Sequence, residues 1–103
     1  MSLDFHISYS RREAERQRPV FSVEEASHAL LAQSVNSAAM PTKLIARIVD
    51  YYSDAEFLAE EIDELILELR MLEGETALQV VQDLLVICEK TVSAKANLYV
   101  FCD

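Results

Sequence analysis

Residues 56–75 read EFLAEEIDELILELRMLEGE, and this stretch indicates a helical protein more clearly than any other part of the chain. Its apolar side chains recur at steps of four, three, four and three residues, which is the spacing of one helix face. They are Leu58, Ile62, Leu65, Leu69 and Leu72. Upstream, Ser53 and Glu56 have the spacing of a capping box, and Gly74 suits the left-handed position that often follows a helix. We therefore predict a helix that begins after Ser53 and ends at Gly74.

The flanking sequence predicts three more helices by the same periodicity. Ser22 and Glu25 form a second possible capping box, which places a helix at residues 23–37. A proline in the first turn suits a further helix over residues 41–52. The last helix should occupy about residues 76–95, and apolar side chains cover half of its circumference. We expect this last helix to be central and to be covered on two sides.

The two ends of the chain read as strands. Residues 3–9 alternate apolar and polar side chains with a period of two, and residues 97–103, NLYVFCD, are rich in β-branched and aromatic types. Between the first strand and the first helix, residues 11–19, RREAERQRP, lack an apolar period and should form an exposed connection. The prediction is an α+β fold that is mostly helical: one domain, residues 1–103, with about four helices and a small sheet formed by the terminal strands.

The charge balance restricts the classes of partner. Eighteen acids against nine bases give a net charge of −9, which repels phosphate backbones and anionic lipid and attracts basic proteins. We expect neither nucleic-acid nor membrane binding. The first residues, MSLDFHISYS, resemble no signal peptide, and the two cysteines should then be reduced, as is usual in the cytoplasm. The expected location is cytoplasmic.

Motifs for catalysis and cofactors do not emerge from the sequence. A phosphate-binding loop needs several glycines, and the chain has one. His6 and His28 lie far apart and neither has the spacing of a zinc pair, so we expect no metal site, and we expect His28 on a helix surface. Cys88 should pack in the core, and a catalytic thiol is not expected because no histidine lies near it in sequence. The expectation is a protein that is not an enzyme and carries no cofactor.

Most of the negative charge lies in one segment, residues 54–75, where nine acids stand against Arg70 alone, a net charge of −8. The simplest interpretation is a solvated helix face. However, the predicted helix would place like charges four residues apart, as in Glu60 with Glu64, and each such pair costs a few tenths of a kcal/mol. A helix optimised for its own stability would mix acids with bases at this spacing. The nine acids are Asp54, Glu56, Glu60, Glu61, Asp63, Glu64, Glu68, Glu73 and Glu75.

Apolar residues also interrupt this acidic face. At 100° per residue, Leu67 and Met71 fall on the side opposite the main apolar stripe, with Phe57 at its edge. An apolar spot ringed by charge is typical of an interface centre with a polar rim, although burial under another helix or under the arginine-rich loop would explain the same pattern. Tyr51 lies just before the acidic segment and could be exposed, whereas Tyr52 fits the apolar stripe of the preceding helix and should be in the core.

Together these features resemble a bacterial immunity protein, the antidote that is made beside a toxin. The chain is short, acidic and free of catalytic motifs, and residues 50–54, DYYSD, place a tyrosine pair beside acids. This patch is similar in kind to the one in nuclease-colicin immunity proteins, where an acidic helix and a tyrosine pair bind the basic toxin. The resemblance implies a basic toxin domain as the partner.

The functional hypothesis is an immunity protein that occludes a toxin through its acidic helix. The alternative is a small acidic interaction module, such as a secretion chaperone, an adaptor or a homodimer, that uses the same apolar spot without a toxin partner. The predicted partner-binding residues are Tyr51, Glu56, Phe57, Glu60, Asp63, Glu64, Leu67, Glu68 and Met71.

Overall fold

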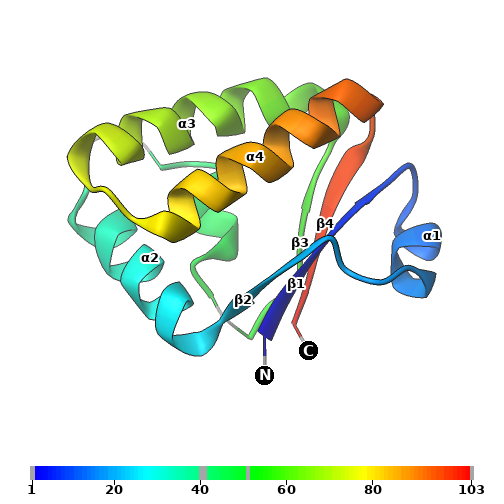
Figure 1. Cartoon of the computed structure of the whole chain (residues 1–103), viewed down its shortest axis with the longest axis horizontal. Helices are drawn as coiled ribbons and strands as arrows, with labels where there is room; N and C mark the ends of the chain where they lie inside the picture. The colour runs from blue at the N-terminus through cyan, green and yellow to red at the C-terminus, as the bar shows by residue number, and fades with distance from the viewer. Residues whose placement is uncertain (1, 40–41, 51, 103) are drawn as a thin grey trace.

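The terminal strands form the centre of the sheet. The computed structural model describes residues 2–39, 42–50 and 52–102. In it β1 (Ser2–Ser8) pairs antiparallel with β4 (Asn97–Cys102), the two ends of the chain side by side as predicted. Figure 1 shows both termini at the same end of the sheet. The α+β prediction is confirmed. Leu3 and Phe5 are buried as the alternation predicts, but His6 and Ser8 on the other face of β1 are buried as well.

Two short strands that the sequence did not predict complete the sheet. They are β2 (Phe21–Glu24) and β3 (Ala55–Phe57), and the strand order is β2-β1-β4-β3. The capping box expected at Ser22 is wrong, because the Ser22 hydroxyl donates to Oδ1 of Asp4 across the β1–β2 pair at 2.7 Å. The helix predicted at residues 23–37 begins only at Glu25.

Three helices cover one face of this sheet (Figure 1). They are α2 (Glu25–Ser37), α3 (Ile62–Glu75) and α4 (Gln79–Ala94). As predicted, α4 is buried over a wide face, and it packs against both α2 and α3. The core lies between these helices and the inward side chains of the strands. None of the helices in the described ranges is long and apolar enough to cross a membrane.

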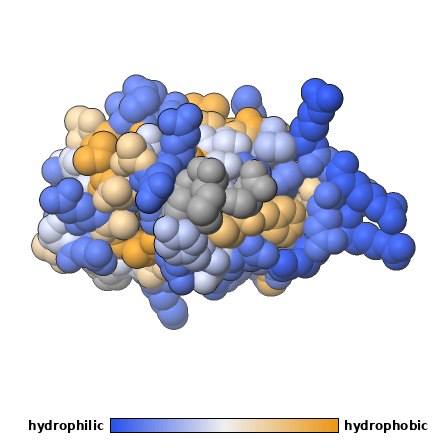
Figure 2. All heavy atoms as spheres, turned by 90° about the horizontal axis from the view of Figure 1, so that it is seen from below, coloured by the Kyte–Doolittle hydropathy of each residue, from blue (hydrophilic) through white to orange (hydrophobic). Residues whose placement is uncertain are grey.

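A fourth helix, α1 (Arg11–Arg16), lies beside the opposite face of the sheet, where the sequence predicted an exposed connection (Figure 1). The Ser10 hydroxyl caps it by accepting a hydrogen bond from the Glu13 amide at 3.2 Å. Arg11 extends over the ring of Phe101, 5.2 Å from its centroid, and donates to Asp54 at 3.1 Å. Figure 2 shows that hydrophilic residues dominate this end of the molecule.

The segment between α2 and α3 departs most from the prediction. The helix expected over residues 41–52 is one turn of 3-10 helix, Ile45–Ile48, while Pro41 itself lies outside the described residues. Tyr52 is 66% exposed, so its predicted place in the core is wrong. His28 is buried, and its Nε2 lies 2.7 Å from the Ile48 carbonyl oxygen, so the predicted surface position is also wrong.

Both predicted ends of α3 are shifted as well. The Ser53 hydroxyl donates to Asp50 at 2.7 Å, and the chain then forms β3 and a second 3-10 turn, Ala59–Glu61, before the α-helix begins. Gly74 lies inside α3 without a positive φ. The helix ends one residue later, where the amide of the cap residue Thr76 donates to the Leu72 carbonyl at 2.9 Å.

Candidate interaction surface

The α3 helix separates its apolar residues onto two sides. The buried side carries four of the five residues of the predicted stripe, and Leu58 lies outside the helix. Those four are Ile62, Leu65, Leu69 and Leu72. On the other side, Leu67 is 61% exposed and Met71 is 53% exposed. The alternative that another helix or the arginine-rich loop of the same chain covers Leu67 and Met71 is therefore wrong.

Acidic side chains flank these two exposed residues. Glu60 lies in the 3-10 turn that leads into α3, and Asp63 and Glu64 occupy the first turn of the helix. All three are exposed, and within the described ranges none of them forms an ion pair. Their spacing of three and four residues aligns them with Leu67 and Met71 on one side. We call these five residues, Glu60, Asp63, Glu64, Leu67 and Met71, the α3 stripe.

The helix boundaries change the electrostatic interpretation of this stripe. Glu56 lies in a strand, so the like-charge helical pair predicted between Glu56 and Glu60 does not form. Asp63 and Glu64 lie at the N-terminus of α3, where negative side chains interact favourably with the helix dipole. The acids therefore oppose the helix less than the sequence implied. What distinguishes the stripe is that its exposed carboxylates and exposed apolar side chains lie together.

Glu68 is not part of the exposed surface, contrary to the prediction. It is 7% exposed, and its two carboxylate oxygens accept hydrogen bonds of 3.0–3.1 Å from the backbone amides of Leu44 and Ile45. These amides begin the 3-10 turn at Ile45–Ile48 and would otherwise lack partners. Glu68 therefore holds the segment between α2 and β3 against α3.

Glu61 has a similar structural role. Its carboxylate accepts two hydrogen bonds from Arg47, at 3.0 and 2.7 Å, and one from the Leu58 amide at 2.9 Å. The hydrogen bond from Arg47 is the main reason that the pKa of Glu61 is lowered. The same hydrogen bond to the Glu61 carboxylate is the main reason that the pKa of Arg47 is raised. Arg47 also donates to the Glu56 carbonyl at 3.0 Å and so ties this turn to β3.

The strand β3 removes two more residues from the predicted surface. Phe57 is fully buried in the core, with the Arg47 guanidinium 5.3 Å from the centre of its ring. Because successive side chains of a strand point to opposite faces, Glu56 lies on the outer face of the sheet, opposite Tyr99 on β4. It is exposed, but on the face of the sheet away from α3. Tyr51 lies outside the described residues.

A hollow of about 290 Å³ adjoins the N-terminal end of the stripe. Glu60 and Asp63 line it from one side, and Val92 and Lys95 line it from the C-terminal end of α4. Val92 is 42% exposed and adds apolar surface next to the carboxylates. The exposed surface around the stripe is therefore continuous from α3 to the end of α4.

The described part of the chain contains no group of three or more metal-ligating side chains. Cys88 is buried in the core, and burial raises the pKa of its thiol to about 12, so it is protonated and unreactive near neutral pH. The chain matches no known protein family, no curated protein and no solved structure. The surface chemistry of the α3 stripe is thus the main guide to function.

Proposed function

We propose that this protein is an immunity protein of the cytoplasm that binds a basic toxin domain through the α3 stripe. Inhibition comes from occlusion of the toxin's active site or substrate groove, and the protein itself catalyses no reaction. Of the residues predicted from sequence, the proposal retains Glu60, Asp63, Glu64, Leu67 and Met71.

One observation supports this proposal above the others: Leu67 and Met71 are more than half exposed among carboxylates that have no ion-pair partner in the described ranges. An exposed leucine alone needs no explanation, because much of any protein surface is apolar. Two such residues one turn apart provide an apolar centre, and the acids around them provide a polar rim. A basic partner would neutralise this rim while it covers the centre.

The charge pattern also favours a basic partner in kinetic terms. Long-range attraction raises the rate of encounter, and apolar contact after docking lowers the rate of dissociation. At the other end of the molecule, α1 carries three arginines and two glutamates, and its Arg11 pairs with Glu15 and Asp54. This end attracts a basic partner less strongly than do the acids of α3 that form no ion pair in the described ranges, and this favours an approach along α3.

The test is capture of the partner followed by a toxicity assay. The tagged protein is incubated with lysate of its native host, and retained proteins are expressed alone and together with this chain. The proposal predicts one stoichiometric basic protein that is toxic alone and harmless in coexpression. Leu67→Asp should abolish protection, whereas Leu30→Asp, at an exposed leucine of α2, should preserve it. Equal protection by both variants would contradict the assigned surface.

A homodimer through the same residues is the rival function. A two-fold axis at Leu67 and Met71 would bring together the acids of both copies, so such a dimer should become tighter as salt screens their repulsion. Sedimentation of the isolated protein at low and high salt distinguishes the two functions. A monomer under both conditions, with a partner that dissociates in high salt, supports the toxin interface.

A further inference from the structure

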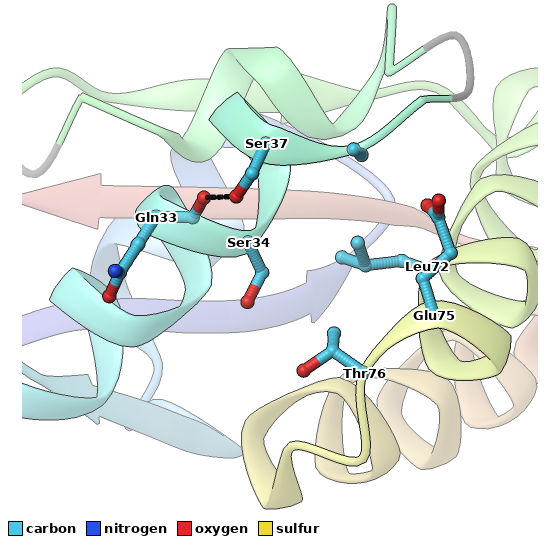
Figure 3. Close-up of a pocket in the computed structure, with 7 residues that line it drawn as sticks. Gln33, Ser34, Ser37, Leu72, Glu75 and Thr76 are labelled. Atoms are coloured by element: carbon cyan, nitrogen blue, oxygen red, sulfur yellow. Dashed lines mark hydrogen bonds between the residues drawn. The ribbon is translucent and has the colours of Figure 1, made fainter.

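A second hollow, separate from the α3 stripe, lies where the C-terminal ends of α2 and α3 meet (Figure 3). Its volume is about 360 Å³. The Leu72 side chain extends into the space between the two helices and closes the hollow from the core side. The lining residues are Gln33, Ser34, Ser37, Ala38, Leu72, Glu75 and Thr76.

Two polar groups of this hollow, the Ser37 hydroxyl and the Glu75 carboxylate, can offer a ligand only acceptors. The Ser37 hydroxyl donates its proton to the Gln33 carbonyl at 2.5 Å, so only its lone pairs remain for a ligand. One carboxylate oxygen of Glu75 accepts from the Ala39 amide at 3.4 Å, and the carboxylate keeps further acceptor capacity at the rim. In Figure 3 the hydroxyls of Ser34 and Thr76 point toward the same space between the helices.

The electrostatics of the hollow favour a cation. Helices α2 and α3 both end here, and each carries about half a negative charge at its C-terminus. Glu75 adds a full negative charge, and no lysine, arginine or histidine is among the lining residues. An anion would therefore be repelled, whereas a group with several N–H donors would meet acceptors on both sides.

We infer that this hollow binds the guanidinium or ammonium group of an alkyl chain, such as an arginine or lysine side chain. Met71 of the α3 stripe lies one helical turn before Glu75, so a partner docked on the stripe could place a basic side chain here. This source of the cation rests on the proposed function. A free alkylguanidine or polyamine would supply the same chemistry without a protein partner.

The binding chemistry is tested with n-butylguanidinium as the probe and neutral n-butylurea as its control. The amide resonances of the isotope-labelled protein are followed during titration with each compound. Saturable shifts are expected at Ser34, Ser37, Glu75 and Thr76 with the cation alone. Glu75→Gln should weaken this binding about threefold, as expected for a partly exposed charge pair. Shifts that fail to saturate, or that spread over the exposed acids without centring on the hollow, would overturn the inference.

A variant that fills the hollow distinguishes the two sources of the cation. Ser34→Leu should abolish saturable binding of the probe, with Asn36→Leu, at an exposed position of α2 outside the lining, as the matched control. A loss of partner affinity specific to Ser34→Leu would assign the site to the partner's side chain. Unchanged partner affinity would assign it to a free cation. If the partner does not depend on the α3 stripe, the proposed function fails, while saturable probe binding would still support the hollow.

Discussion

Glu64 and Glu68 lie one turn apart on α3 but belong to different regions of the molecule. Glu64 is exposed beside Leu67 and Met71, whereas Glu68 is buried and binds the amides of Leu44 and Ile45. The same contrast holds for the apolar residues, since Leu67 faces solvent and Leu69 faces the core. The inner side of α3 therefore stabilises the fold, and the outer side is available for binding.

The largest expected effect compares two leucines on these two sides. Leu69→Ala should reduce the free energy of unfolding by about 3 kcal/mol, because it leaves a cavity in a core where Leu69 is 1% exposed. Leu67→Ala should change it by no more than about 0.5 kcal/mol. Urea unfolding of both variants measures the difference. Comparable losses would mean that Leu67 is covered in the free protein.

The two glutamates provide the next comparison. Glu68→Ala should cost about 2 to 3 kcal/mol, because two buried amides lose their acceptor. Glu68→Gln should cost less, since one amide oxygen can replace Oε1, which accepts from both Leu44 and Ile45. Glu64→Ala should stay within about 0.5 kcal/mol of the wild type. A destabilising Glu64→Ala would show that this carboxylate supports the fold.

The smallest of the expected losses of stability, after those of Leu69 and Glu68, concerns Glu61 and depends on pH. Glu61→Gln should cost about 1 kcal/mol at neutral pH, where the carboxylate is charged and bound by Arg47. The pKa of Glu61 is lowered from 4.5 in the folded protein, so its contribution is complete above that value and is lost as pH falls through the lower folded pKa. The difference between wild type and variant should therefore disappear in acid. A constant difference across pH would contradict the assigned ion pair.

Long regular patterns could be predicted from the sequence, and short elements could not. The alternation of β1 and the buried apolar faces of α3 and α4 each include enough residues for the period to be clear. In contrast, β2 and β3 have four and three residues, too few to distinguish a strand from the first turn of a helix. Capping-box spacing then occurred by chance at both places.

The candidate surface was predictable only in part, for a geometric reason. Residues four apart differ by about 40° around a helix, and this small step takes Glu64 from solvent to the buried position of Glu68. No property of the two glutamates themselves distinguishes them. The hollow near Ser34 and Glu75 was not predicted, because it requires the ends of α2 and α3 to meet in space.

The most direct test of the α3 stripe is the salt dependence of binding to the captured partner. The double variant Glu60→Lys/Glu64→Lys is compared with a control double variant, Glu24→Lys/Glu73→Lys. The control changes the net charge by the same amount, but at exposed acids away from the stripe. The stripe variant should weaken binding by at least about tenfold and make its salt dependence shallower, with the control close to wild type. Equal effects of the two double variants, or none, would contradict a specific interface on α3.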